Sequence, residues 1–208
     1  MTPLEDESQG GVMHGRLPWY SPSELTERQY AVYEAIVLGA RSRGPQAFRL
    51  VDDEGRLEGP FNAMLVNPKV AMSVQAVGAA VRFESLLSDR AREIAILRLA
   101  SLEQCDFEWY AHERVGLKNG LTEEELGVLK RGSFPSTFDP EEVLVGEVVT
   151  SLQSTRALSD ELFSKALEIL GLTKLADVIT LVGYYQLLSL SVNAWHVPLP
   201  AGEVSPFA

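Results

Sequence analysis

The stretch REIAILRLASLEQCDFEWYAHERVGLKNGLTEEEL, residues 92–126, decides the fold that we expect for the whole chain. Its first half belongs to an amphipathic helix that the apolar spacing predicts over residues 88–104. Its second half predicts a further helix over residues 105–120, which ends at a glycine. Thr122 and Glu125 have the Thr-x-x-Glu spacing of a capping box, which predicts a third, short helix. Consecutive helices joined by short turns indicate an all-α domain.

Four chemically distinctive residues, Cys105, Glu108, Trp109 and His112, lie within residues 103–113. If this segment is helical, its residues turn by about 100° each, and the four side chains fall within one sector of roughly 100°. Glu108 and His112 are four residues apart, so the carboxylate can orient or charge the imidazole. Such a pair can move protons near neutral pH.

A simpler explanation is a solvated Glu–His ion pair, with Cys105 and Trp109 serving only as packing residues. Two observations favour a site instead. Cys105 and Trp109 both prefer burial, so the face that carries the polar groups is expected to be covered. Glu93 lies on a strongly apolar predicted helix, where an ionisable group needs a partner. The candidate catalytic residues are therefore His112, Glu108, Glu93 and Cys105.

The remaining sequence predicts a single domain over residues 17–208, preceded by a flexible segment, 1–16. Residues 45–60 form a connector, either a short hairpin around Asp53-Glu54-Gly55 or a loop over a pocket. Caps and apolar spacing predict other helices in segments 21–43 and 68–83, from Pro140 onwards, and in segments 159–171 and 173–193. The total is seven or eight helices and very little strand.

The composition limits the possible partners and the location of the chain. Its 208 residues carry a formal net charge of −11, which argues against nucleic-acid binding. The single cysteine cannot form an internal disulfide, which fits a cytoplasmic protein. The N-terminal segment lacks the pattern of a signal peptide. No uninterrupted apolar run reaches the roughly 18 residues of a membrane span, and segment 178–195 is interpreted as a buried helix.

No cofactor is expected from the motifs. His14, His112 and His196 are scattered without metal-ligand spacing, so no metal site is predicted. The chain has no glycine-rich phosphate loop, so no nucleotide is expected. A small-molecule substrate is the partner that fits this pattern.

Residues 92–126 resemble the carboxymuconolactone decarboxylase and alkylhydroperoxidase-D-like (AhpD-like) superfamily. The shared pattern is a glutamate on one helix, a Cys-x-x-Cys-x-x-x-His segment on the next, and a Gly-Leu-Thr turn into a short helix. Glu93, Cys105, His112 and the turn at 120–122 match this pattern. The resemblance implies an AhpD-like helical domain that assembles as a homo-oligomer, a trimer or hexamer.

The resemblance also implies residue roles. Glu93 and His112 fall on proton-relay positions, and Cys105 falls on the first cysteine of the redox pair. Glu108 replaces the second cysteine, so a disulfide within the chain cannot form and dithiol peroxidase activity is not expected. The true decarboxylases carry a proline-containing segment after the Gly-Leu-Thr turn. Segment 131–140 is a poor substitute for it, so the resemblance does not identify the substrate.

The resulting hypothesis is a cofactor-free lyase or isomerase that acts on a small organic acid, lactone or related metabolite by Glu/His proton transfer. The substrate-binding candidates are Trp109, Tyr184 and Asn193, together with Tyr185. A substrate carboxylate would need an arginine, and the candidates are Arg49, Arg82, Arg92 and Arg98. The alternatives are a thiol peroxidase-type antioxidant enzyme and a non-catalytic helical oligomer.

Overall fold

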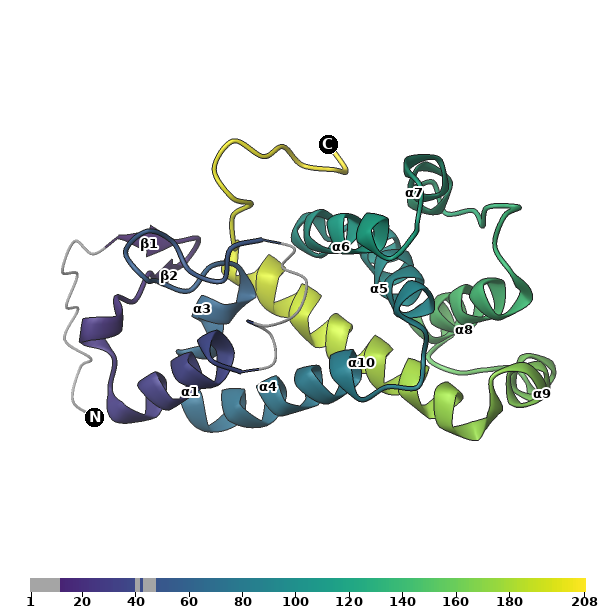
Figure 1. The fold of residues 1–208 in the computed structure, drawn as a ribbon, viewed down its shortest axis with the longest axis horizontal. Helices are drawn as coiled ribbons and strands as arrows, with labels where there is room; N and C mark the ends of the chain where they lie inside the picture. The colour runs from purple at the N-terminus through teal and green to yellow at the C-terminus, as the bar shows by residue number, and fades with distance from the viewer. Residues whose placement is uncertain (1–11, 40–41, 43–47) are drawn as a thin grey trace.

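The computed structural model describes residues 12–39, 42 and 48–208, and within them it shows an all-α architecture with one minimal hairpin (Figure 1). Strands β1 (Met13–His14) and β2 (Leu17–Pro18) pair antiparallel and precede a short 3-10 helix, Pro22–Glu24. The α-helices are α1 (Glu27–Val37), α3 (Pro60–Met64), α4 (Pro68–Phe83), α5 (Asp89–Glu103), α6 (Asp106–Lys118), α7 (Glu123–Lys130), α8 (Pro140–Thr155), α9 (Asp160–Ile169) and α10 (Gly171–Trp195).

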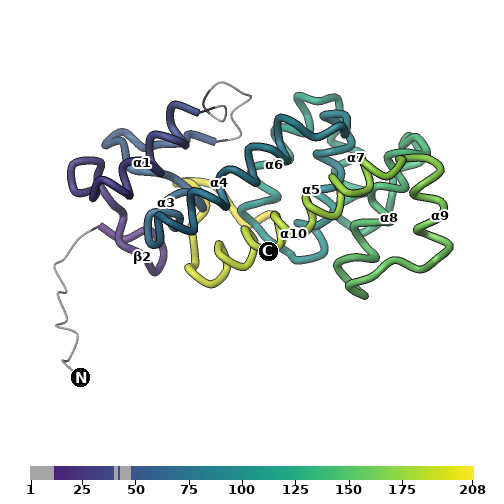
Figure 2. The backbone as a smooth tube through the Cα atoms, turned by 90° about the horizontal axis from the view of Figure 1, so that it is seen from below, coloured from purple at the N-terminus to yellow at the C-terminus, as the bar shows by residue number. Residues whose placement is uncertain are grey.

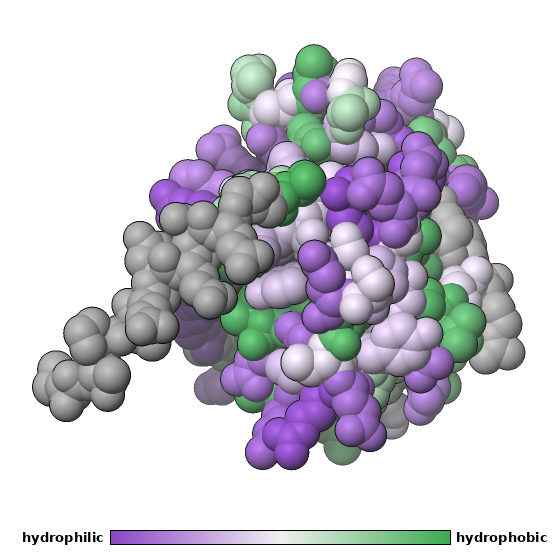
Figure 3. Space-filling model, turned by 90° about the vertical axis from the view of Figure 1, so that its left-hand side faces the viewer, coloured by the Kyte–Doolittle hydropathy of each residue, from purple (hydrophilic) through white to green (hydrophobic). Residues whose placement is uncertain are grey.

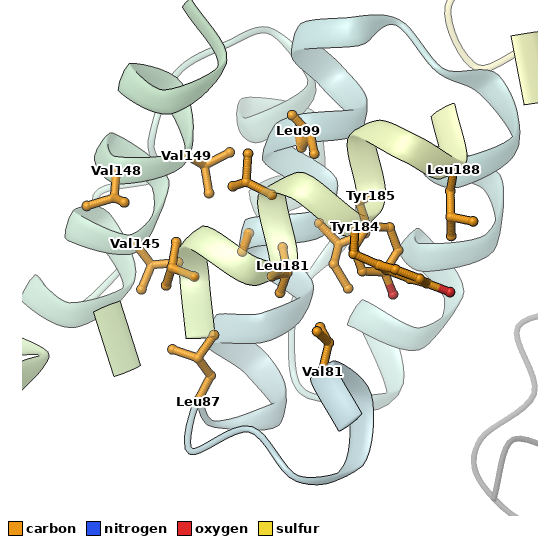
Figure 4. Packing of buried hydrophobic residues seen from close by; sticks show 14 of the residues in the cluster. Val81, Leu87, Leu99, Val145, Val148, Val149, Leu181, Tyr184, Tyr185 and Leu188 are labelled. Carbon is orange, nitrogen blue, oxygen red and sulfur yellow. The ribbon is translucent and has the colours of Figure 1, made fainter. Parts of the chain in front are cut away.

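The long helix α10 runs through the middle of the molecule, with α1, α3 and α4 towards one end and α7, α8 and α9 towards the other (Figures 1 and 2). It contacts α3, α4, α5, α8 and α9. In the main core, three α8 valines lie beside Leu181, and Tyr184 and Tyr185 project from the following turn of α10 (Figure 4). Helix α5 contacts α6, α7, α8 and α10, so it links this core to the candidate site.

Side-chain caps set the starts of several helices where the sequence predicts them. The Ser88 side chain accepts a hydrogen bond from Ala91 N at the start of α5. The Thr122–Glu125 capping box at the start of α7 is confirmed. The predicted start of the last helix at residue 173, with Thr173 as its cap, is wrong, because α10 already begins at Gly171.

The N-terminal part differs from the sequence expectation. The paired strands at 13–18 show that ordered structure begins before residue 17, while residues 1–11 lie outside the described part. The single helix expected from residue 21 is instead a 3-10 turn followed by α1, because the capping box of Thr26 starts a new helix. In the connector, Val51 and Leu57 form an isolated antiparallel bridge, as a short hairpin requires.

Helix α10 is long and apolar enough to cross a membrane by length and composition, with a mean hydropathy of 1.4 in its most apolar window. Half of that window is buried inside the protein, and the core helix of a soluble protein passes the same test. Gln186 and nearby serines interrupt the apolar sequence of segment 178–195, which is interpreted as a buried helix for that reason.

The end-on view in Figure 3 shows hydrophobic patches lying among hydrophilic ones on the face nearest the N-terminal elements.

Candidate active site

A sharp break between α5 and α6 sets the geometry of the site. Gln104 adopts a left-handed conformation with φ 48°, which ends α5, and Cys105 is the N-cap of α6. The break lies at the boundary predicted between the helices over 88–104 and 105–120. Residues 103–113 are therefore not one helix, and the helical spacing that relates Glu108 to His112 does not extend to Cys105. Gly116 leaves room for Leu121 of the turn after α6, because a Cβ there would lie 2.8 Å from Leu121 Cδ1.

His112 lies between two carboxylates. Its Nδ1 is 2.7 Å from Glu93 Oε2, and its Nε2 is 3.6 Å from Glu108 Oε2. All three residues are buried, with exposed fractions of 6% for His112, 1% for Glu93 and 3% for Glu108. The structure thus brings together three of the four predicted catalytic residues, and Glu93 rather than Glu108 makes the shorter contact with the imidazole.

Tyr185 covers the imidazole from α10. Its ring meets the His112 ring edge-on, with the ring centroids 5.2 Å apart, and Tyr184 packs edge-on against Tyr185 at 5.3 Å. Burial, together with the nearby charges of Glu93 and Glu108, raises the pKa of Tyr185 well above its usual range. Tyr185 is therefore a neutral phenol beside the histidine.

Cys105 is fully buried beside this group. A thiol at a helix N-terminus commonly has a lowered pKa. Here burial, and next the charge of Glu108, raise the pKa of Cys105 to about 11, although a hydrogen bond with Ser189 acts in the opposite direction. The thiol therefore stays protonated at neutral pH. Ser189 is a neighbour that sequence reasoning did not select; its only signal was a polar residue within the apolar segment 178–195.

The structure places two predicted substrate-binding residues away from His112. Trp109 packs into a second cluster against Phe207, and its Nε1 donates to Glu113 Oε2 at 2.7 Å. Asn193 is exposed and lines a separate cleft near the N-terminus of α6. Helical spacing alone does not separate Trp109 from His112, because residues 107–112 of α6 are all buried. Neighbouring side chains of such a helix pack into different regions.

The four candidate arginines also separate. Arg49 is exposed and pairs with Asp53 at 2.6 Å. Arg98 is directed towards α8, where its Nε donates to Thr150 Oγ1 at 2.9 Å. Arg92 lies next to the site, with its Nε 3.8 Å from Glu93 Oε1, and the charge of Arg82 acts on Tyr185.

The arrangement suits proton transfer in a covered environment. If the Glu93 carboxylate accepts the Nδ1 proton of a neutral imidazole, Nε2 is left as the proton acceptor, and Glu93 stabilises the imidazolium that forms. Within the described ranges, no group of three or more His, Cys, Asp or Glu side chains is arranged to hold a metal ion.

Comparisons with known proteins give a family match over part of the chain and a similar fold. Residues 68–144 match the model of the carboxymuconolactone decarboxylase family, and this span contains Glu93, Cys105, Glu108 and His112. The chain is similar in structure to a protein of unknown function from Agrobacterium tumefaciens, described as a candidate antioxidant defence protein AhpD. That match has a TM-score of 0.60 and 16% identity, and covers 69% of this chain and 99% of the other. No curated protein matches the sequence.

Proposed function

Because the family match over residues 68–144 and the AhpD-like fold support membership of the carboxymuconolactone decarboxylase and AhpD-like superfamily, we propose that this chain is a cofactor-free lyase or isomerase. Its substrate is a small organic acid, lactone or related metabolite. The observation that carries the proposal is the buried group in which His112 lies between Glu93 and Glu108.

In this mechanism His112 Nε2 exchanges a proton with a substrate carbon or a leaving oxygen. Glu93 holds the imidazole through Nδ1 and stabilises its charged form. Glu108 faces the Nε2 edge and is placed to take part in the proton relay. An unsaturated or carbonyl group in the substrate must accept the electron pair that is released when the carbon–hydrogen or carbon–carboxylate bond breaks.

A thiol peroxidase is the main competing function, and the surroundings of Cys105 disfavour it. A peroxidatic thiol reacts as its thiolate, whereas burial raises the pKa of Cys105 to about 11. Glu108 stands one helical turn further along, where the superfamily's dithiol pattern has its second cysteine. We therefore assign Cys105 a pocket-lining rather than a redox role.

A non-catalytic scaffold is the second alternative. The burial of two carboxylates around an imidazole supports the catalytic proposal, because a scaffold gains little from groups that are costly to remove from water. A surface ion pair, which the simplest sequence interpretation predicted, would not have this burial.

We also propose that the working form is a homo-oligomer, a trimer or hexamer, in the cytoplasm. Four large apolar residues on one sector of α10 are exposed, and together with α3 and α4 this helix forms an apolar groove of about 260 Å³. The four residues are Leu172, Ile179, Leu187 and Leu190. A second copy of the chain would cover this face. Light scattering of the wild type and of an Ile179→Glu, Leu190→Glu variant tests it; a monomeric wild type would contradict it.

The catalytic proposal is tested with His112→Gln and Glu93→Gln on a panel of lactones and enoic acids. Turnover, or exchange of substrate carbon-bound hydrogen with deuterium, is expected to fall by about a hundredfold or more in each variant. His196→Gln is the matched control, because His196 is exposed on the surface. Unchanged turnover in both site variants would remove this mechanism.

A further inference from the structure

A pocket of about 310 Å³ is lined by polar and apolar residues from the end of α4, the start of α5 and the last turns of α6. Its lining includes Arg82, Asp89, Arg92, Val115 and Asn119. Val115 and Asn119 follow His112 by three and seven residues on α6, so they lie on the same face of that helix. The pocket therefore opens about one helical turn from the imidazole.

Arg92 lines this pocket, and the described residues supply hydrogen-bond acceptors for only some of its guanidinium nitrogens. Its side chain is 9% exposed, and one Nη donates to Asp89 Oδ1 at 2.8 Å. Its Nε lies 3.8 Å from Glu93 Oε1, is buried, and has no hydrogen-bond partner within the described part of the chain. Because Nε itself is covered, an acceptor in the pocket would meet Arg92 at its Nη groups, one of which is held only by the 70% exposed Asp89.

Arg82 is the second arginine that lines this pocket. It comes from the last turn of α4 and lines the pocket together with Arg92. Its positive charge acts on the Tyr185 hydroxyl, and Tyr185 packs against His112. Arg82 thus acts on Tyr185, which packs against His112. Arg92 lies next to Glu93, which contacts the imidazole.

We propose that this pocket is the substrate carboxylate site, in which Arg92 and Arg82 bind the carboxylate of a short-chain unsaturated acid and direct its carbon chain towards His112. The inference rests on the proposed function and narrows its substrate class to carboxylates. It also selects two of the four arginines that the sequence left equivalent. In the free protein one Nη of Arg92 is already bonded to the Asp89 carboxylate. An incoming substrate carboxylate therefore competes with Asp89 for the guanidinium.

The test measures binding of crotonate, a short unsaturated carboxylate, to the full-length protein by ligand-observed NMR titration. Crotonamide, which has the same shape without the charge, is the matched ligand. Wild type is expected to bind crotonate in a saturable manner and crotonamide far more weakly. Arg92→Gln and Arg82→Gln are each expected to weaken crotonate binding by about tenfold or more, because each removes charge-assisted hydrogen bonds.

Two further variants distinguish the proposal from a general charge effect and from misfolding. Arg49→Gln removes the same charge from an exposed ion pair and is expected to leave binding unchanged. Asp89→Asn frees Arg92 from its internal carboxylate and is expected to tighten crotonate binding, an effect that unfolding cannot produce. Asp53→Asn, which makes the same charge change at the 92% exposed partner of Arg49, is its control.

Equal crotonate binding by wild type, Arg82→Gln and Arg92→Gln would overturn the proposal, as would the absence of saturable binding by wild type. Either result leaves the His112 mechanism to be judged by its own turnover assay. Conversely, His112→Gln is expected to bind crotonate while losing turnover. If it binds crotonate and also keeps full turnover, the mechanism fails while the carboxylate site stands.

Discussion

Helix α5 carries two buried ionic groups one turn apart, and they differ in the basic residue at their centre. Glu93 faces His112, whose other nitrogen faces a second carboxylate. Arg90 instead binds Glu125 at 2.7 Å and Glu142 at 2.6 Å, and also donates to the carbonyl of Gly120. In each group, one basic side chain lies close to two carboxylates.

The difference lies in whether the charge at the centre can change. An arginine stays protonated, so the Arg90 group has a single charge state and holds α5, α7 and α8 together. Glu125 and Glu142 also close the capping boxes of α7 and α8, which fixes both carboxylates. A histidine can gain or lose its proton near neutral pH. The Arg90 group is therefore suited to stability and the His112 group to proton transfer.

The largest loss of stability is expected for Arg90→Met. This change leaves two buried carboxylates without their counter-ion, so the free energy of unfolding should fall by about 3–5 kcal/mol. Urea unfolding followed by circular dichroism measures it, with Arg49→Met as the exposed control. A loss no greater than that of the control would show that the Arg90 group is not the stabilising one.

A pH-dependent loss is expected to come from Glu125. Burial alone would raise its pKa, but hydrogen bonds from Arg90, Thr137 and Thr122 N outweigh burial and hold the pKa at about 2, below the ordinary 4.5. Because the folded-state pKa is depressed, this stabilisation is present above about pH 4.5 and is lost as the pH falls towards about 2. It amounts to roughly 3 kcal/mol.

Glu125→Gln should remove that part of the acid dependence when unfolding is measured as a function of pH. Glu123→Gln, an exposed change in the same helical turn, should retain it. Identical acid profiles for wild type and Glu125→Gln would contradict the assigned role.

A smaller stability change is expected for His112→Gln, about 1–3 kcal/mol, because the amide can still donate one hydrogen bond to Glu93. His112→Gln should then lose mainly turnover, whereas Arg90→Met should lose mainly stability. Chemical unfolding and turnover per folded molecule, measured on the same preparations, separate the two. If His112→Gln lost mainly stability and Arg90→Met lost mainly turnover, His112 would be the stabilising residue and Arg90 the one that the reaction needs.

The smallest effect is expected for Cys105→Ser, with a loss of about 1 kcal/mol, because serine keeps the size and the hydrogen bond to Ser189. Turnover on the organic acid should change little. In wild type, alkylation by iodoacetamide should be slow at neutral pH, since the pKa of Cys105 is raised to about 11. Loss of a measurable peroxide turnover in this variant would favour the thiol peroxidase.

Local sequence signals predicted much of the fold because they act over a few residues. Ser88 and the Thr122–Glu125 pair define helix starts by hydrogen bonds within one turn, and these are confirmed. The boundary between residues 104 and 105 was predicted, but the left-handed conformation of Gln104 that forms it was not, because a left-handed residue other than glycine has no strong local signature. Because Cys105 is the N-cap of α6 and not part of its regular turns, helical spacing could not place it relative to His112.

The site could be predicted only where residues shared a helix or matched the superfamily pattern. Glu108 and His112 are linked by the four-residue spacing, whereas the Glu93–His112 contact depends on how α5 packs against α6. The position of Trp109 shows the limit of the spacing argument. A helix buried on several sides sends adjacent residues into different parts of the core, and only tertiary packing decides which.

Gln104 has one more consequence, for how the protein fails when heated. The reversal of the chain at this residue leaves Glu93 and His112 on rigid helices rather than on a mobile loop. The carboxylate and the imidazole therefore have no hinge of their own, and they can separate only when α5 and α6 come apart. Thermal inactivation should then coincide with melting of the helical bundle instead of preceding it.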